Sequence, residues 1–588
     1  MAKPPGAVLY AIAAMAAAPP SGARPRGLRA LLPGLAVPLA FFLVGLAVLD
    51  DYGMTWDENE SYRAGLQNLS NLPALATGGS EIEWPWHELR GYQFLFDTVR
   101  AAFALAVAPL WDGTGEAVLV GTELAPIPIR AFHLFHLLVS AATVLLTYRV
   151  GVELSGRVRV GVLAALVLAT LPKFVAHSQN NPKDGIGLFV FTLSLWAVAR
   201  ATRAAGERAP FARAGAALGL AFASHVLAAL LVPIAGVWVL WRRPGPLRRR
   251  LAALAVLFAA AGAVAFLLWP WLWPDPLIRT ARVLRRIATY RVEIDVLYLG
   301  RVYPWADPPW HYFLVNLLAS TPVAVTLTAL LGAWTAFRRG SAENEGRVEV
   351  PSSPPGEEER VRVRRGDRLA RFALLWLAVP VAIEAFAGAR YDGVRHLMVV
   401  LPALALLAAL GLEQLLELAR RSDPPPPRLL ARLALGLAAA SWGWLAVDLV
   451  RYHPYQDAYL DPAVRAAVGR AAPELFELEY WGASFKEGAA WLNEHAPPGS
   501  RVLVPIAPHC AAPYLDPDLV LVAPDPTVAP PEEDFEADYL MAMTRTAMDT
   551  PQMREVRAGR EPVFTVTRLG STLLEVYRLD VRLRLDVR

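Results

Sequence analysis

Residues 251–269 read LAALAVLFAAAGAVAFLLW, a run of apolar and small residues without a charged side chain. About 20 such residues in a helix cross the roughly 30 Å hydrocarbon core of a bilayer. The segments 31–49 and 160–175 hold almost no charge either. Runs of this length predict a polytopic α-helical membrane protein.

The composition of the whole chain agrees with this prediction. Of its 588 residues, 55% are hydrophobic and 19% are charged, whereas soluble domains carry about 25% charged residues. The mean hydropathy is +0.35. The net charge of +4 does not indicate nucleic-acid binding, and the single cysteine, Cys510, excludes an internal disulfide.

We predict about eleven transmembrane helices. They lie near residues 31–49, 130–150, 158–178, 185–202, 211–225, 226–241, 251–269, 311–337, 369–388, 396–418 and 429–448. The pair between 211 and 241 is also compatible with one long helix and a re-entrant piece.

The arginine-rich loops predict the orientation of these helices, because basic loops stay in the cytoplasm. Loops 242–250, 338–371 and 420–432 carry five, nine and four basic residues, and eleven spans put all three on the side of the N-terminus. Loop 50–129, with twelve acidic and three basic residues, then faces outward. We therefore predict three parts: a cytoplasmic tail over 1–30, a transmembrane domain over 31–449 and an extracytoplasmic domain over 450–588. The transmembrane domain includes a first extracytoplasmic loop over 50–129 and a flexible cytoplasmic loop over 338–368.

The region after residue 449 is less hydropathic and is predicted to form a small α/β domain. Residues 501–506 and 519–522 are typical of buried strands, and 486–495 of a helix. The alternating segments 562–568 and 572–579 flank Leu569-Gly570-Ser571, which predicts a hairpin.

Four predicted outer loops concentrate the polar chemistry. The first contains Asp57 and Glu58, where adjacent carboxylates suit base catalysis or cation binding but also simply cap a helix. The second runs from His177 to Gly185 and includes Lys183, in a chain that has only four lysines.

The third and fourth loops bring positive charge to the same side. Residues 276–290 form an amphipathic pattern, with arginines on one face, that is typical of a helix lying in the membrane interface. The aromatic residues from Tyr303 to Tyr312 suit either interface anchoring or sugar stacking. The fourth loop, 389–396, contains Tyr391, Asp392, Arg395 and His396, a cluster able to bind phosphate.

In combination these segments resemble the GT-C superfamily of integral membrane glycosyltransferases, most closely glycosyltransferase family 39, which includes protein O-mannosyltransferases and aminoarabinose transferases. The motifs that carry the resemblance are Thr55-Trp56-Asp57-Glu58, His177 through Asp184, Tyr391 through His396, His453-Pro454-Tyr455-Gln456 and Tyr480 through Ser484. They cover about residues 55–500 in family order.

The resemblance implies an inverting transferase of a bacterial inner membrane that uses a polyprenyl-phosphate sugar and acts outside the cytoplasm. Asp57 would deprotonate the acceptor hydroxyl, with support from Glu58, and Lys183, Arg395 and His396 would neutralise the leaving phosphate. Asn181 and Asp184 would orient donor or acceptor, and His177, Tyr303, Tyr391 and Asp392 complete the predicted substrate-binding set.

This chemistry calls for no certain cofactor, and a divalent metal is compatible with it but not required. The partners implied are the lipid-linked donor, a lipid, glycan or protein acceptor, and membrane lipids. A transporter or lipid flippase is the alternative function, although bare span centres and missing repeats count against it. A non-catalytic envelope scaffold is a third, and it predicts that Asp57 does not face the cavity bounded by Lys183 and Arg395.

Overall fold

A computed structural model gives the fold. It describes residues 28–77, 82, 84, 93–111, 116–120, 123–204, 208–289, 292–344, 357–386, 390–420, 426–523, 534–579 and 583–584. Most of the predicted tail, 1–30, and the middle of the predicted cytoplasmic loop, 345–356, lie outside these residues.

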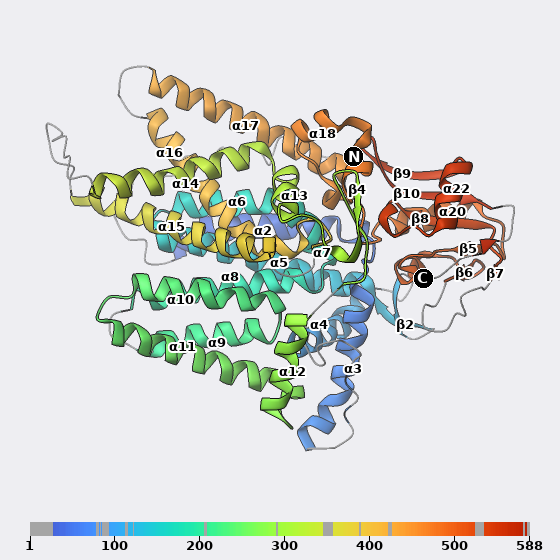
Figure 1. The fold of residues 1–588 in the computed structure, drawn as a ribbon, viewed down its shortest axis with the longest axis horizontal. Helices are drawn as coiled ribbons and strands as arrows, with labels where there is room; N and C mark the ends of the chain where they lie inside the picture. Colours follow the sequence, from blue (N-terminus) through green and yellow to red (C-terminus); the bar gives the residue numbers. More distant parts are fainter. Residues whose placement is uncertain are drawn as a thin grey trace.

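The helices that are long and apolar enough to cross a membrane run roughly parallel and fill one part of the molecule (Figure 1). Among the described residues there are six, or eight if each of two bent pairs is one span. The six lie in α5 (Ile129–Ser155), α8 (Asp184–Ala201), α11 (Leu247–Leu268), α15 (Glu357–Phe386), η6 with α16 (Arg395–Val400 and Leu401–Arg420) and α17 (Pro427–Tyr452). The predicted membrane fold is confirmed.

The remaining predicted spans coincide with shorter or bent elements. Three short apolar helices match the first, fifth and sixth predicted spans: α2 (Leu28–Ala47), α9 (Ala209–Phe222), and η3 with α10 (Val226–Leu230 and Leu231–Arg242). The apolar stretches of these elements, Pro33–Ala47, Ala209–Phe222 and Val226–Arg242, have only 10–17 residues, fewer than the about 20 that a full crossing requires. The number of spans that cross the bilayer therefore stays a prediction.

Two of the predicted spans, 158–178 and 311–337, are bent, because each is broken at a proline. The first consists of α6 (Val158–Thr170) and α7 (Pro172–Asn180), which meet at 69°, and the second of α13 (Tyr312–Ser320) and α14 (Val323–Asn344), which meet at 114°. Proline lacks the N–H that would continue a helix but is well tolerated in the first turn of the next one. The predicted polar loop after residue 177 therefore begins inside α7, and only residues 181–183 separate α7 from α8.

The acidic segment 50–129 is more than a loop. It contains α3 (Glu58–Thr77), α4 (Phe94–Val107) and a hairpin of β1 (Ala117–Val120) and β2 (Glu123–Pro128). Helix α12 (Pro276–Thr289) confirms the predicted amphipathic helix, and Figure 1 shows it lying across the direction of the neighbouring α11.

The C-terminal part forms a separate layer at one end of the helices (Figure 1). Its five-stranded sheet has the order β6-β5-β8-β10-β9, with parallel pairing around β5 and antiparallel pairing from β8 to β9. The strands are β5 (Arg501–Leu503), β6 (Val520–Val522), β8 (Tyr539–Met543), β9 (Phe564–Arg568) and β10 (Ser571–Arg578), with α20 (Phe485–His495) and α22 (Pro551–Gly559) as the main helices. The predicted hairpin is confirmed, whereas the central strand β8 was missed because all five of its side chains are buried and show no alternation.

Close helix packing positions the start of α16, which follows directly on the fourth predicted loop. A Cβ atom added to Gly411 would lie 1.9 Å from the carbonyl oxygen of Thr328, and one added to Gly332 would lie 2.0 Å from that of Leu407. Small residues allow this approach of helix backbones inside a membrane. The contact therefore anchors the helix that carries Arg395 at its N-terminal end.

Candidate functional site

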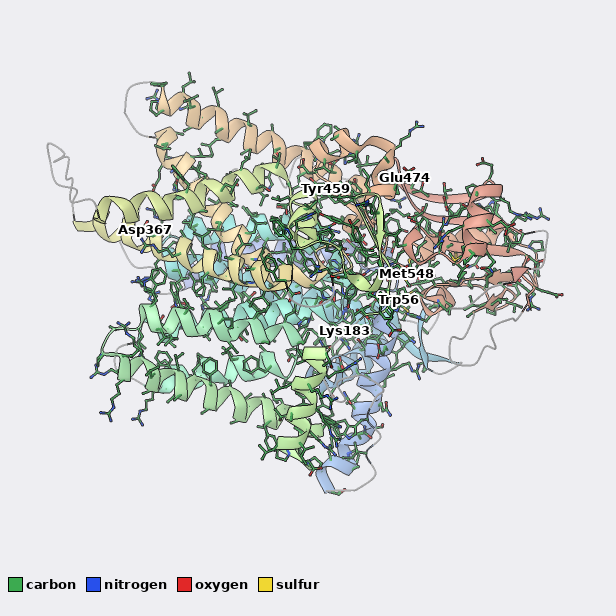
Figure 2. All side chains as sticks on the ribbon, in the orientation of Figure 1. Trp56, Lys183, Asp367, Tyr459, Glu474 and Met548 are labelled. Atoms are coloured by element: carbon green, nitrogen blue, oxygen red, sulfur yellow. The ribbon has the colours of Figure 1, made fainter. Side chains whose placement is uncertain are left out.

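The polar side chains of three predicted outer loops meet where the helices join the C-terminal domain. Trp56 and Lys183 mark this junction in Figure 2. Asp57 precedes α3, Lys183 lies between α7 and α8, and Arg395 opens η6. The tertiary structure thus brings together residues from distant parts of the sequence.

Asp57 is held between two cations. Lys183 donates from Nζ to Oδ1 of Asp57 over 3.3 Å, and Nη2 of Arg395 contacts Oδ2 of the same carboxylate. The side chain of Asp57 is 15% exposed. The predicted base and two predicted phosphate-binding residues are therefore direct neighbours.

Arg395 links three carboxylates through three different nitrogens. Its Nε donates to Asp184 over 2.8 Å and its Nη1 to Asp392 over 2.7 Å, while Nη2 reaches Asp57. The indole of Trp481 lies 4.7 Å from the guanidinium carbon, in a cation–π contact. A planar guanidinium with five N–H donors can make this set of contacts, whereas an ammonium cannot.

Asn181 and Asp184 hold the short loop between α7 and α8. The Oδ1 of Asn181 accepts from the backbone N–H groups of Lys183 (3.1 Å) and Asp184 (2.7 Å), and its Nδ2 donates to Asp184 over 3.1 Å. His225 contacts the other oxygen of Asp184 at 3.2 Å. These bonds fix the loop that carries Lys183, so the two residues orient the site.

His177 stands behind this loop. Its Nδ1 lies 3.2 Å from the amide nitrogen of Asn181, and its Nε2 lies 3.4 Å from the hydroxyl of Tyr480. Its ring meets the Trp481 indole edge-on at 4.8 Å. The structure thus joins the predicted His177 to the cluster through the C-terminal segment.

Glu58 makes no hydrogen bond or ion pair with Lys183 or Arg395 in the described part of the chain, and the support of Asp57 that the resemblance implies for it stays a prediction. It is fully buried, and it accepts from the backbone N–H of Thr55 over 2.6 Å and from the Thr55 hydroxyl over 3.0 Å. The Tyr62 hydroxyl also donates to it, and Nε2 of His133 lies at 2.8 Å. These bonds shape the turn that presents Asp57.

The remaining predicted residues divide into two groups. Tyr391 and His396 pack ring to ring at 4.6 Å beside Arg395, and Nε2 of His396 is buried without a hydrogen-bond partner among the described residues. Tyr303 instead packs near Tyr298 on a separate hairpin of β3 (Val296–Tyr298) and β4 (Arg301–Tyr303). In the described part of the chain no hydrogen bond or ion pair joins its side chain to the cluster, so a substrate-binding role of Tyr303 stays a prediction.

Sequence reasoning missed Arg545, which donates from Nη2 to Oδ1 of Asp392 over 2.8 Å. It also did not assign His225 or Trp481 to the site. Trp481 could have been found from the motif 480–484, to which it belongs. Arg545 follows strand β8, which was not predicted, and no sequence pattern around it indicates a role.

The electrostatics of the cluster are dominated by its ion pairs. Burial alone would raise the pKa of Asp57, but Arg395 and Lys183 outweigh burial and lower it. Burial lowers the pKa of Lys183, and Asp57 and Glu60 more than offset that effect and raise it. Asp57 is therefore an anion and Lys183 a cation at neutral pH. Within the described residues no group of three or more His, Cys, Asp or Glu side chains is arranged to hold a metal ion.

Residues 119–269 match the family model described as dolichyl-phosphate-mannose-protein mannosyltransferase. This match confirms the predicted family resemblance over that segment. It includes α5 to α11, and hence Lys183 and Asp184, but neither Asp57 nor Arg395.

Several solved structures are similar to this chain. ArnT from Cupriavidus metallidurans in the apo state is 14% identical, with 93% of this chain and 97% of that chain covered and a TM-score of 0.46. The oligosaccharyltransferase AglB from Archaeoglobus fulgidus, in complex with an inhibitory peptide and a dolichol-phosphate, is 12% identical, with 87% and 69% covered and a TM-score of 0.48. The Pmt1-Pmt2 complex of S. cerevisiae, bound to the sugar donor, is 16% identical, with 49% and 40% covered and a TM-score of 0.32. No curated protein matches the sequence.

Proposed function

We propose that this protein is a membrane glycosyltransferase that moves a sugar from a polyprenyl-phosphate donor to an acceptor hydroxyl, with inversion at the anomeric carbon. The observation that carries the proposal is the contact of Asp57 with both Lys183 and Arg395. A carboxylate and two cations at one point are the groups that glycosyl transfer from a phosphate needs.

The positions of these groups support the following reaction. Asp57 takes the proton of the acceptor hydroxyl, and the acceptor oxygen attacks the anomeric carbon from the face opposite to the phosphate. The bond between that carbon and the phosphate oxygen breaks, and the electron pair leaves with the phosphate. Lys183 and Arg395 then stabilise the charge of the polyprenyl phosphate, because charge-assisted hydrogen bonds favour the more negative product.

Donor binding also makes Asp57 a better base. The same two cations lower the pKa of Asp57 when no phosphate is bound. A donor phosphate competes for Lys183 and Arg395 and so weakens their hold on the carboxylate, which raises its affinity for a proton. Asp57 is therefore a stronger base with the donor bound than without it.

The charge pattern supports a site outside the cytoplasm. Arginine-rich loops 242–250 and 338–371 favour the cytoplasm, and the cluster lies beside the C-terminal domain that the eleven-span topology puts on the opposite side. We propose a bacterial cytoplasmic membrane as the location, and Asn181, Asp184 and His177 as residues that orient donor or acceptor.

The test uses the full-length protein in membranes supplied with polyprenyl-phosphate sugars. Asp57→Asn is expected to abolish sugar transfer and to leave thermal unfolding close to that of the wild type. Asp51→Asn is the matched control, because Asp51 belongs to the same segment but pairs with His453 instead. Full activity in a folded Asp57→Asn variant would refute the base assignment, and lipid movement without sugar transfer would favour the flippase alternative.

A further inference from the structure

We propose that the C-terminal domain completes this site and that Arg545 is the positioning residue through which it acts. Arg545 holds Asp392, and Asp392 in turn sets the orientation of Arg395. The binding experiment below rests on the function proposed above, whereas the structural experiment below does not.

Arg545 is buried just beyond the C-terminal end of β8, the central strand of the C-terminal sheet. Its side chain is 4% exposed. It donates from Nη2 to Asp392 over 2.8 Å and from Nη1 to the carbonyl oxygen of Tyr480 over 3.0 Å, and its Nε lies 3.7 Å from Glu477. A buried arginine needs such partners, because desolvating an unpaired charge is costly. Its position is therefore defined by the groups around it.

Asp392 is shared between two arginines. Its Oδ1 accepts from Arg545 and its Oδ2 from Arg395, at 2.8 and 2.7 Å. The residue adopts φ +53°, a left-handed conformation that aspartate tolerates better than most residues. The Tyr312 hydroxyl accepts from the N–H of the following Gly393 over 2.9 Å. The turn and the two arginines together fix the direction of the carboxylate.

The loss of Arg545 would leave Oδ1 of Asp392 buried without its cation. A carboxylate and a guanidinium form a bidentate pair when both carboxylate oxygens are free. Asp392 would then rotate and bind Arg395 through both oxygens. This rotation would draw the guanidinium away from Asp57 and Asp184, which it now also contacts.

Charge balance points the same way. Arg545 offsets the negative charge of Asp392, which lies next to the cation assigned to the donor phosphate. Glu477, also close to Arg545, has a pKa that burial raises to about 7, partly offset by Arg545 itself. Without Arg545 the surroundings of Arg395 would be more negative and would repel a phosphate.

A second contact of the same domain restrains Asp57. The carbonyl oxygen of Trp481 accepts from the N–H of Trp56 over 2.8 Å, and Trp56 directly precedes Asp57. The indole of Trp481 covers Arg395, and the residue before it, Tyr480, is held by Arg545. The guanidinium of Arg545 also lies 5.9 Å from the Trp56 ring. One domain therefore positions both members of the Asp57–Arg395 pair.

Arg557 offers a closely matched control inside the same domain. It pairs with Asp549 at 2.8 Å and with Glu575, and it donates to the carbonyl oxygen of Met543 over 2.8 Å. Arg545 likewise has two carboxylates and one main-chain carbonyl as partners. Arg557 does not touch the cluster, so its loss reports on the stability of the domain alone.

The experiment compares Arg545→Gln, Arg545→Lys and Arg557→Gln as full-length proteins in nanodiscs. Binding of undecaprenyl phosphate is measured by native mass spectrometry, and folding by thermal unfolding. Arg545→Gln should weaken binding about tenfold, as for other residues that orient a binding group. Arg545→Lys should recover part of the affinity, and Arg557→Gln should bind like the wild type even if its melting temperature falls equally.

Unchanged binding by Arg545→Gln, or an equal loss in Arg557→Gln, would overturn the proposal. If the wild type itself does not bind undecaprenyl phosphate, the proposed function fails and the positioning role is decided separately. A cryo-EM structure of Arg545→Gln then gives the answer. Loss of the contact between Arg395 and Asp57 supports the role, and retention of that contact refutes it.

Discussion

The guanidinium of Arg395 contacts the carboxylate of Asp57, although 338 positions of the chain separate the two residues. The contact joins the start of α3 to the start of η6, and a second carboxylate, that of Asp184, contacts the same guanidinium. A proposed base and a proposed phosphate ligand are thus mutual partners until a substrate separates them. The following predictions depend on this arrangement.

Replacement of Arg395 by lysine should remove most of the activity even though the charge is kept. A lysine ammonium cannot span Asp57, Asp184 and Asp392 with fixed geometry. We expect kcat for sugar transfer to fall roughly 100-fold, as when one electrostatic partner of a transition state is lost. Arg390→Lys is the control, because Arg390 lies in the same loop but pairs with Asp307. Equal losses in both variants would contradict the prediction.

Replacement of Lys183 by methionine should change the pH dependence of transfer. Lys183 helps to lower the pKa of Asp57, so its removal raises that pKa. The base is then protonated at a higher pH, and the acidic limb of the kcat/KM profile moves to higher pH. The profile is measured between pH 4 and 9, with Lys486→Met as a control that pairs with Glu116 instead. An acidic limb that stays in place would show that Asp57 does not set it.

Replacement of Glu58 by glutamine should reduce stability more than chemistry. Glu58 accepts hydrogen bonds from Thr55 and Tyr62 and lies against His133, all of them buried. Leaving such a partner unsatisfied costs about 1–3 kcal/mol, so the melting temperature should fall while measurable transfer remains. Glu60→Gln, in the same helical turn but more exposed, should scarcely change it. Complete inactivity of a stable Glu58→Gln variant would assign Glu58 a direct catalytic role.

The stability of the protein should fall as the pH rises toward 7, in part through Glu477. Burial raises the folded-state pKa of Glu477 to about 7, above the roughly 4.3 of an unperturbed glutamate. Between these values the folded state holds a proton that the unfolded state has released, so the stability that this proton provides is lost on raising the pH.

Glu477→Gln should therefore flatten the change in melting temperature between pH 5.5 and 8. Thermal unfolding at the two pH values checks this, with Glu494→Gln as a control at an exposed position of α20. An unchanged difference in melting temperature between the two pH values would exclude Glu477 as a contributor.

The membrane-spanning elements were predictable because the bilayer imposes a local rule. A helix must carry enough consecutive apolar residues to cross it, and such runs are visible without knowledge of any contact. The breaks at Pro172 and Pro322 had a local signal too, since both are prolines, but apolar length alone hides a bend. Strand β8 left no such signal, because it is buried on both faces.

The sequence predicted residues of the site but not their arrangement in space. Rare lysines, acidic pairs next to apolar runs and a basic outer loop indicated Lys183, Asp57 and Arg395, and the family resemblance added a role for each. The same reasoning included Tyr303, which packs near Tyr298 on a separate hairpin, and paired Glu58 with Asp57, although the hydrogen-bond partners of Glu58 are Thr55, Tyr62 and His133. Residue type indicates possible chemistry, whereas direction depends on the packing of the neighbouring elements.

The sequence by itself thus determined a helical membrane protein with a C-terminal α/β domain and a set of acidic and basic residues suited to glycosyl transfer from phosphate. Only the tertiary structure decided that Asp57, Lys183, Asp184, Asp392 and Arg395 form one network, and that Arg545 belongs to it. The physical reason is the distance along the chain over which each feature is determined. A transmembrane helix depends on consecutive apolar residues, whereas an ion pair between distant positions forms only when the chain has folded.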